Sequence, residues 1–222
     1  MQTGTRPGRF ITFEGGEGAG KSTQVRRLVD ALRAKGIDVV ATREPGGSPG
    51  AEDIRQLLVT GDPGRWDPVT EAFLHFAARR DHLARTVWPA LDRGAWVVSD
   101  RFADSTLAYQ GYGHGLGRDV IERLYAAAVG DFRPDLTVLL DIPVEQGLQR
   151  AAGRAGQAGG SGPSAAEDRY ERMDRGFHER LRAGFLDMAA REPARFVVVD
   201  ARRDADAVWA DVIAAVEQRL GR

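Results

Sequence analysis

The chain has no cysteine among its 222 residues. Disulfide bonds, thiolate chemistry and cysteine-ligated zinc are therefore excluded. Long apolar runs are also missing, since stretches such as Val138–Leu140 and Phe196–Val199 are far too short to span a bilayer. The leader MQTGTRPGR has no apolar core of the kind that a secretory signal carries. We therefore expect a cytoplasmic protein without a membrane partner.

Neither sign of charge is in excess. The formal net charge is −1, so bulk charge does not favour nucleic acid or a membrane surface as a partner. Hydrophobic residues make up 42% of the chain and charged residues 28%, which is typical of a globular protein. The length suits a single domain over residues 1–222 with a small insert.

Apolar runs alternate with helical patterns along the whole chain. The runs are rich in Val, Ile, Phe and Leu and contain little polar alternation, as expected for strands buried on both faces of a parallel sheet. The predicted strands are Phe10–Phe13, Val39–Thr42, Trp96–Ser99, Leu136–Leu140 and Phe196–Val199. The predicted helices are Gln24–Lys35, Val69–Leu91, Arg118–Val129, Val144–Ala152, Arg169–Arg191 and Ala205–Leu220. This order predicts an α/β three-layer sandwich.

The segment GRAGQAGGSGPSAAED, Gly153–Asp168, breaks the alternation. It is rich in glycine and serine and cannot contribute to a core. One interpretation is a tolerated surface loop. The other is a functional flap, because Arg150, Arg154 and Arg169 lie within or beside it. Its position alone does not decide between the two.

The stretch GGEGAGKS, Gly15–Ser22, matches the phosphate-binding pattern G-x-x-x-x-G-K-[ST]. Its glycines allow successive N–H groups to turn inward around an anion, and the helix that follows presents its positive end. Lys21 is expected to reach the β- and γ-phosphates, and Ser22 offers its hydroxyl to Mg²⁺. The stretch therefore predicts a nucleoside triphosphate site without selecting a class of P-loop protein.

The third strand ends in VVSDRFADSTLAYQG, Val97–Gly111. Asp100 is well placed to position Mg²⁺ beside the P-loop strand, directly or through water. Arg101 would then point into the cleft between the nucleotide and an acceptor. The same Asp-Arg dipeptide at the end of a strand would also be found in an ordinary surface ion pair.

Two further segments are expected to border this cleft, TREPGGSPGAEDIRQLL after the second strand and FLHFAARRDHL on the long helix. Phe76 and Arg80 lie one helical turn apart and share a face, so the pair is able to stack on a base and bond its edge. A core phenylalanine beside a solvated arginine has the same spacing and is the more common case.

The sequence resembles bacterial thymidylate kinases (dTMP kinases), of the P-loop nucleoside-monophosphate kinase type. The resemblance is carried, in order, by FEGGEGAGKST, TREPGGSPGAEDIRQLL, FAARRDHL, SDRFADSTLAYQG, DLTVLLDIPVEQGLQR and DRYE. It implies a five-stranded parallel sheet, a homodimer, and transfer of a phosphoryl group from ATP with Mg²⁺ to dTMP.

The resemblance also implies roles for individual residues. For ATP it implies Gly15, Gly16, Glu17, Gly18, Ala19, Gly20, Lys21, Ser22, Thr23 and Arg202. For dTMP it implies Glu44, Pro45, Gly46, Phe76, Arg80, Arg101, Ser105, Thr106, Tyr109 and Gln110. Phe76 would stack on thymine and Arg80 would bond its edge, while Tyr109 would crowd the 2′ position. Arg79 precedes Arg80, and the sequence leaves open which of the two reads the base.

Members of this family differ in where their catalytic arginine lies. This P-loop has none, so the resemblance implies the type that supplies arginines from a lid, here about residues 150–171. The implied catalytic set is Glu17, Lys21, Arg101, Arg150 and Arg154. The implied metal set is Ser22, Asp100 and Glu171, with an ordinary ion pair as the alternative for Glu171.

Two other functions are also compatible with a P-loop. A P-loop kinase for another small acceptor, such as a different nucleotide, would give no reason for Phe76, Tyr109 and REPGG to occur together. A non-catalytic nucleotide-binding switch would be expected to carry the guanine-reading motif N-K-x-D, which the sequence lacks.

Overall fold

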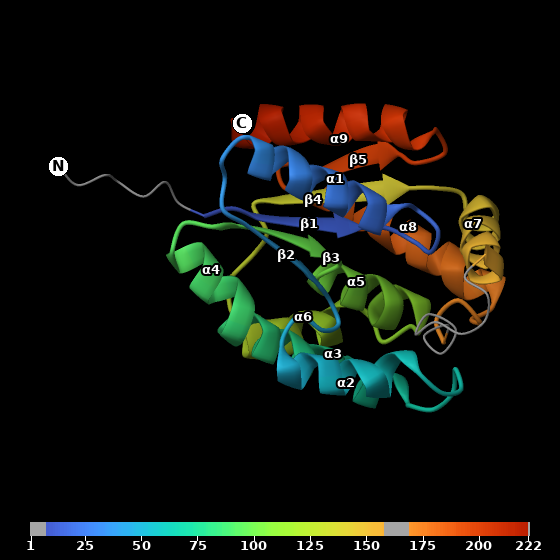
Figure 1. The fold of residues 1–222 in the computed structure, drawn as a ribbon. Helices are drawn as coiled ribbons and strands as arrows, with labels where there is room; N and C mark the ends of the chain where they lie inside the picture. The colour runs from blue at the N-terminus through green and yellow to red at the C-terminus, as the bar shows by residue number, and fades with distance from the viewer. Residues whose placement is uncertain (1–7, 158–168, 222) are drawn as a thin grey trace.

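The computed structural model describes residues 8–157 and 169–221, without the side chains of 154–157. A five-stranded parallel sheet forms its centre, in the order β2-β3-β1-β4-β5 (Figure 1). The strands are β1 (Phe10–Glu14), β2 (Val39–Arg43), β3 (Trp96–Asp100), β4 (Leu136–Asp141) and β5 (Phe196–Asp200). The predicted strands and fold class are confirmed. Each strand runs one residue further than predicted and ends on a charged side chain, because that residue still pairs at the edge of the sheet.

Both faces of the sheet are covered, which explains why its strands lack polar alternation. Phe10 and Val97 point into one apolar cluster, whereas Ile11 and Val98 point into the other. Helices α1 (Lys21–Ala34) and α9 (Ala205–Leu220) lie on the Ile11 side (Figure 1). The opposite layer is formed by α3 (Pro68–His82), η1 (Leu83–Val87), α4 (Trp88–Asp92), α5 (Ala103–Thr106), η2 (Leu107–Gly113), α6 (Arg118–Val129) and α8 (Arg175–Arg191).

The long helix predicted over Val69–Leu91 is divided. It consists of α3, the π-helical turn η1 and the short helix α4. Pro89 has no N–H to donate to the carbonyl four residues earlier, at Arg85, and the wider turn lies where that bond would fall. Two helical segments were not predicted at all, α2 (Pro49–Val59) and the α5–η2 segment.

The last helices agree more closely with the prediction. Helix α7 (Val144–Gln157) extends beyond its predicted end, and α6 and α9 have their predicted bounds. Helix α8 begins only at Arg175, because the Asp174 side chain caps it by accepting a hydrogen bond from the Phe177 amide at 2.8 Å. Residues 158–168, the middle half of the predicted lid, lie outside the described residues.

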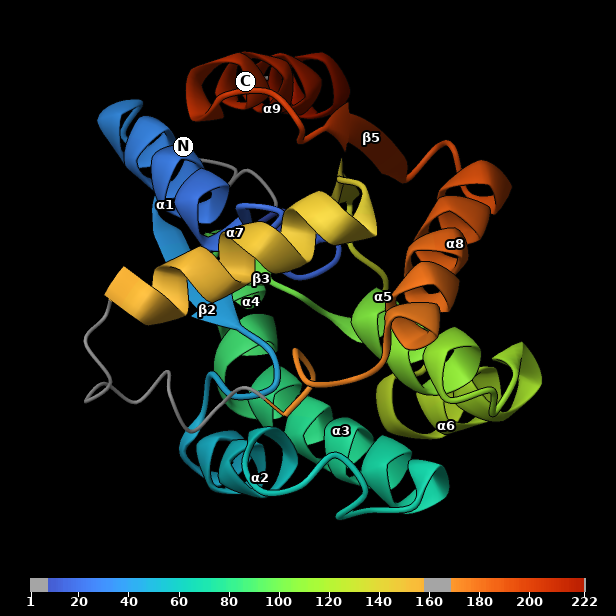
Figure 2. The same ribbon diagram turned by 90° about the vertical axis from the view of Figure 1, so that its right-hand side faces the viewer.

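The carboxyl ends of all five strands meet at one edge of the sheet, where parallel α/β proteins place their sites. Figure 2 looks toward this edge, and α7 lies across it between α1 and α8. The loops after β1, β2 and β3 bring the glycine-rich stretch, the REPGG segment and the Asp100–Arg101 pair to the same place. Within residues 8–157 and 169–221, no helix combines the length and hydropathy needed to cross a membrane.

Candidate active site

The glycine-rich stretch forms a tight loop between β1 and α1. Gly15, Gly18 and Gly20 have φ angles of 138°, 70° and 91°, which L side chains rarely adopt. Gly18 also packs against α7, since a Cβ atom on it would lie 1.9 Å from the carbonyl oxygen of Gly147. The loop therefore requires glycine at Gly18 for two reasons, its backbone angles and its contact with α7.

Lys21 folds back over this loop. Its ammonium donates to the carbonyl oxygens of Gly15 at 3.1 Å and Gly16 at 2.8 Å. Burial, together with the nearby charge of Arg101, lowers the pKa of Lys21 to about 8, against the opposing charge of Glu17. The loop thus holds a cation that is close to titrating at neutral pH.

Ser22 and Asp100 face one another across the mouth of the loop. The Ser22 hydroxyl donates to Asp100 Oδ2 at 2.8 Å. A hydroxyl and a carboxylate are oxygen donors, which Mg²⁺ prefers in proteins. The residue types at this point therefore fit a magnesium ion.

Arg101 occupies the centre of the site. It has a φ of 70°, an unusual backbone angle for a residue that is not glycine. Its guanidinium donates to Gly15 O at 3.0 Å, Ser105 Oγ at 3.1 Å and Glu17 Oε1 at 3.0 Å. It lies over the ring of Tyr109, 5.0 Å from the centroid. Strain of this kind concentrates at functional sites.

Glu14 supports the turn that carries Arg101. This fully buried carboxyl accepts hydrogen bonds from the Phe102 amide at 2.7 Å and from Ser105 Oγ at 2.6 Å. Burial and the charge of Asp104 raise the pKa of Glu14 to about 8. The turn is therefore anchored from beneath by an acid at the end of β1.

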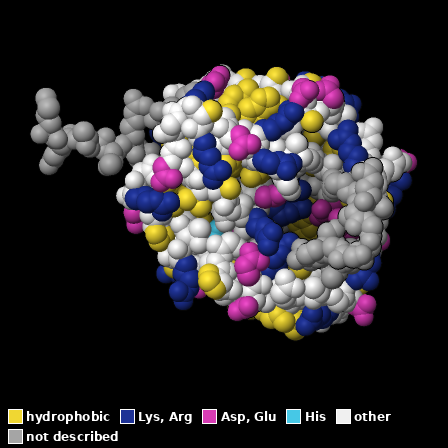
Figure 3. Space-filling view, in the orientation of Figure 1, with side chains coloured by type: hydrophobic (Ala, Val, Ile, Leu, Met, Phe, Trp, Pro, Cys, Tyr) yellow, Lys and Arg dark blue, Asp and Glu magenta, His cyan; other side chains and the backbone are white. Residues whose placement is uncertain are grey.

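Two adjoining hollows lie at this edge of the sheet and share the side chains of Glu17, Glu44, Arg55 and Arg101. The first, the phosphate cleft, is lined by the predicted residues Glu17, Gly18, Ala19, Gly20, Lys21, Ser22, Thr23, Asp100 and Arg101. Glu44, which was predicted for the acceptor, also lines it, as do Arg43 and Arg55, which were not predicted. Figure 3 shows Lys and Arg side chains gathered around the hollow on this face.

The second hollow, the acceptor pocket, lies between the REPGG turn, α3 and the α5–η2 segment. Of the residues predicted for the acceptor, its lining includes Glu44, Pro45, Arg101, Ser105, Thr106, Tyr109 and Gln110. Gly46, Phe76 and Arg80 do not line it. His75 and Tyr170 do, although the sequence did not assign them, and so does Arg79, which the sequence left open as the alternative to Arg80.

The structure decides the position of the two arginines on α3. Arg79 is buried and donates to Glu44 Oε2 at 2.8 Å and to Thr106 Oγ1 at 2.9 Å. Arg80 is exposed, lies over the ring of Trp88 and donates to Ala128 O at 3.3 Å. The assignment of Arg80 to the acceptor is therefore corrected to Arg79, because Arg80 points to the outer side of the helix.

The aromatic position on α3 is also corrected by one residue. Phe76 packs in the apolar core, edge-on to Tyr125, and lies beneath the guanidinium of Arg79 at 4.8 Å. His75 takes its place in the pocket wall, with Nε2 at 2.9 Å from the Tyr170 hydroxyl. Burial and the charge of Arg79 lower the pKa of His75 to about 4 against the charge of Glu71, so the ring is neutral at pH 7.

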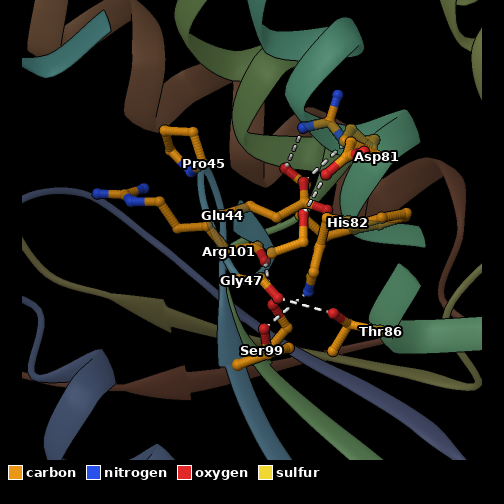
Figure 4. Close-up of polar contacts among 12 residues, drawn as sticks. Glu44, Pro45, Gly47, Asp81, His82, Thr86, Ser99 and Arg101 are labelled. Atoms are coloured by element: carbon orange, nitrogen blue, oxygen red, sulfur yellow. Dashed lines mark hydrogen bonds and ion pairs between the residues drawn. The ribbon is translucent and has the colours of Figure 1, made fainter. Parts of the chain in front are cut away.

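Glu44 holds the pocket together between the end of β2 and α3 (Figure 4). Its carboxylate accepts from Arg79 and also from His82 Nδ1 at 2.9 Å, while His82 Nε2 bonds Thr42 Oγ1 at 2.7 Å. Burial opposes its ionisation, but the charge of Arg79 and the bond from His82 lower the pKa of Glu44. Gly46 lies outside the pocket and turns the chain with a φ of 126°.

Glu17 links the phosphate cleft to the acceptor pocket. Its carboxylate accepts from Arg101 and from the Tyr109 hydroxyl at 2.5 Å. Burial opposes ionisation, yet the charges of Arg101 and Lys21 and the Tyr109 bond lower the pKa of Glu17 to about 2. This acid is therefore a carboxylate whenever the site is assembled.

Two buried polar atoms of the acceptor pocket have no hydrogen-bond partner among the described residues. They are Nη1 of Arg79, a donor, and Oε1 of Gln110, an acceptor. Burying such groups unpaired is costly, so native proteins rarely do it without a reason. A donor and an acceptor left open in one pocket suit a ligand whose edge offers one of each.

The remaining predicted residues are placed differently. Arg150 donates to the carbonyl oxygens of Ala201 and Arg202, each at 2.8 Å, so it braces the loop after β5 and does not face the phosphate cleft. The Arg202 side chain is itself exposed and pairs with Asp200 at 2.7 Å. The side chain of Arg154 lies outside the described residues.

Two residues at the C-terminal end of the predicted lid also need correction. Glu171 lines the acceptor pocket and not the phosphate cleft that contains Ser22 and Asp100, so the structure does not bring the three predicted metal ligands together. Arg169 is buried and donates to three carbonyl oxygens of the α2–α3 connection, which excludes it from the phosphates.

A polar stripe on α3 carries Arg79 together with three side chains that the sequence did not assign. Glu71, His75, Arg79 and His82 are spaced by four, four and three residues, and all four are buried. Residues at this spacing share one helix face. Buried polar residues repeated at a helical period are the signal that would have identified them.

Comparison with known proteins agrees with this geometry. The family model described as thymidylate kinase matches residues 13–212. A thymidylate kinase from Caulobacter vibrioides is 56% identical over 96% of this chain and 98% of its own length. One from Ruegeria pomeroyi is 51% identical over 97% of each chain.

A solved structure gives the same result. The crystal structure of thymidylate kinase from Ehrlichia chaffeensis superposes with a TM-score of 0.74, at 32% identity, and covers 95% of this chain and 100% of the other. The family model spans both hollows and all of the five strands except the first residues of β1. The chain therefore belongs to the thymidylate kinase family.

Proposed function

We propose that the chain transfers the γ-phosphoryl group of ATP to dTMP and so forms dTDP. The open donor and acceptor in the acceptor pocket, beside a P-loop, carry this proposal. Thymine presents an acceptor at O4 next to a donor at N3. Arg79 Nη1 supplies the matching donor and Gln110 Oε1 the matching acceptor. Cytosine presents the reverse order, a donor at N4 and an acceptor at N3, and would leave both protein atoms unpaired.

The sugar of the acceptor would lie against Tyr109 and Glu17. The Tyr109 ring is held between Arg101 at 5.0 Å and Tyr170 at 5.2 Å, and its hydroxyl bonds Glu17. A ring fixed on three sides has little room to move aside. We infer that Tyr109 occupies the space that a ribose 2′-hydroxyl would need, so that deoxyribonucleotides are preferred.

Phosphoryl transfer requires positioning and neutralisation of charge more than proton transfer. Lys21 would bind the triphosphate. Arg101 lies in the wall shared by the two hollows and would contact the phosphoryl group while it is transferred from ATP to the acceptor. Arg43 and Arg55 line the same cleft and add positive charge. Of the predicted lid arginines, Arg154 remains a proposed contributor.

The reaction is proposed to use Mg²⁺ bound with ATP. The Ser22 hydroxyl and the Asp100 carboxylate, which lie 2.8 Å apart, would hold the ion directly or through water. A magnesium ion there supplies charge neutralisation to the phosphates. The protein side chains orient the nucleotide on either side of it.

An ADP-release assay with a panel of acceptors tests the proposal. The acceptors are dTMP, dUMP, UMP, dCMP, AMP, GMP, shikimate and none. We expect strong turnover with dTMP, weaker turnover with dUMP and little with UMP or dCMP. Turnover with another acceptor would support the assignment as a P-loop kinase but reject the proposed contacts to thymine. ADP release that is independent of any acceptor would reject the kinase.

The titration of Lys21 predicts how ATP use depends on pH. The ammonium attracts phosphate and the neutral amine does not, so ATP is used well below the pKa of about 8 and poorly above it. We expect kcat/KM for ATP, which reports the free enzyme, to fall by about tenfold per pH unit above that value, through KM. Lys21→Arg should lose this slope because a guanidinium stays protonated. An unchanged slope in Lys21→Arg would contradict the assignment.

We also propose that the chain is a homodimer through the outer face of α3. Val69 and Phe73 are 42% and 57% exposed there and lie one helical turn apart, followed by exposed Ala77. Contiguous apolar surface of this kind marks an interaction site.

Light scattering during gel filtration tests the dimer. Phe73→Asp should convert a dimer of about twice 24.1 kDa into a monomer, because a charge cannot be buried unpaired in the interface. Val198→Asp, at a 49% exposed valine on edge strand β5, is the matched control and should remain dimeric. A dimeric Phe73→Asp variant would place the interface elsewhere.

A further inference from the structure

The amide of Gln110 is held from behind by Glu71. Gln110 is fully buried, and its Nε2 donates to Glu71 Oε1 at 2.6 Å. Glu71, at the start of α3, is also fully buried. This hydrogen bond leaves the amide oxygen of Gln110 on the side away from Glu71, as the open acceptor in the pocket wall.

Glu71 is an ionised carboxylate in this environment. Arg169 Nη2 lies 2.5 Å from its Oε2, and His114 Nε2 lies 3.5 Å from its Oε1. Burial opposes ionisation, but the nearby imidazole of His114 and the charge of Arg169 lower the pKa of Glu71 to about 2. A carboxylate only accepts hydrogen bonds, so the Gln110 amide must turn its NH₂ group toward it.

We propose that Glu71 is a positioning residue for base specificity, which fixes the Gln110 amide with its oxygen toward the acceptor base. A pocket wall that offers an acceptor at this point favours a base with N3–H, such as thymine or uracil. It disfavours cytosine, whose N3 is itself an acceptor. The inference rests on the proposed use of dTMP and deepens it, because Glu71 itself contacts no substrate.

The surroundings of Glu71 make it a rigid reference point. Arg169 donates to the carbonyl oxygens of Leu58 at 3.1 Å, Asp62 at 2.9 Å and Pro63 at 2.7 Å while it pairs with Glu71. Its guanidinium is therefore fixed by the α2–α3 connection. The ion pair therefore places the Glu71 carboxylate, while the orientation of the Gln110 amide follows from the carboxylate's being an acceptor only.

The test compares kcat/KM for dTMP with kcat/KM for dCMP in wild type and variants. In E71Q the new amide can donate to Gln110 Oε1, which lets the Gln110 amide turn over and present NH₂ to the base. The dTMP to dCMP ratio should then fall by about tenfold or more, mainly through KM, since one hydrogen bond changes from matched to mismatched. E71D remains an acceptor only and should keep a high ratio.

Arg169→Met is the matched control. It removes the ion pair but leaves a carboxylate at Glu71, so it should lower stability and keep the substrate ratio. If E71Q alone does not fold because Arg169 is left without its partner charge, the double variant E71Q/R169M removes both charges and carries the same test.

The outcomes separate this inference from the proposed function. Wild type that does not phosphorylate dTMP would reject the function. Wild type that prefers dTMP, with an unchanged dTMP to dCMP ratio in a folded E71Q or E71Q/R169M, would reject only the role of Glu71. Equal losses for both substrates in E71Q would mean that Glu71 is merely structural.

Discussion

Arg101→Met is expected to lower kcat by about 10³-fold or more, which is a loss of about 4 kcal/mol of transition-state stabilisation. Arg101 lies in the wall shared by the phosphate cleft and the acceptor pocket, and its guanidinium reaches Gly15 O at 3.0 Å. The same guanidinium also lies over the ring of Tyr109, 5.0 Å from its centroid. Steady-state rates with saturating ATP and dTMP measure the effect.

Arg118→Met is the control for this experiment. Arg118 pairs with Glu122 at 3.0 Å on the surface of α6, away from both hollows, and its loss should change kcat by less than about twofold. The thermal midpoints of both variants show whether they are folded. A folded Arg101→Met enzyme within tenfold of wild type would remove Arg101 from the transfer step.

Arg79→Lys is expected to raise KM for dTMP by about 10- to 100-fold, with a smaller change in kcat. Lysine keeps a positive charge beside Glu44, but it cannot form the arginine fork that bonds Glu44 and Thr106 and leaves Nη1 for the base. Arg80→Lys, one residue away, should leave KM within about twofold, because Arg80 contacts Ala128 and Trp88 outside the pocket.

Initial rates over a range of dTMP concentrations distinguish the two variants. The pair is informative because the sequence alone left open which arginine reads the base. If Arg80→Lys raised KM more than Arg79→Lys, the orientation of α3 described above would be wrong.

The sequence predicted the central sheet well, because two-sided burial leaves an unmistakable pattern. Strands that are covered by helices on both faces are continuous apolar runs, and all five were found to within one residue. Helix α2 was missed because its first residues stand in GGSPG, which reads as a loop. Yet Ser48 and Pro49 are the start signals of a helix, and α2 begins at Pro49.

The P-loop side of the site could be assigned from a local motif. Lys21, Ser22 and the glycines depend only on a strand, a turn and a helix that are contiguous in sequence. The acceptor side depends on how α3 is rotated about its axis, and that rotation is set by core packing of residues such as Ala72 and Phe76. Neighbouring residues on a helix differ by about 100° in direction, so a shift of one position exchanges Arg80 for Arg79 and Phe76 for His75.

The lid arginines show another limit of prediction from local sequence. Arg150 and Arg169 lie beside a glycine-rich segment, a sequence context that is typical of arginines that bind phosphate. In the structure each donates to main-chain carbonyl oxygens, of residues 201–202 and 58–63 respectively. These carbonyl groups are far from the two arginines in sequence. Because every residue has a main-chain carbonyl, the residue types do not show which ones will accept the hydrogen bonds.

The most direct test of the account is a competition between dTMP and dCMP for the same enzyme with Mg²⁺ and ATP in one tube. The ratio of dTDP to dCDP formed at equal concentrations gives the ratio of the two kcat/KM values. The account predicts dTDP in excess by about 100-fold or more, because Arg79 and Gln110 match the edge of thymine and oppose that of cytosine. Comparable amounts of the two products would contradict it, since the open donor and acceptor would then not be reading the base.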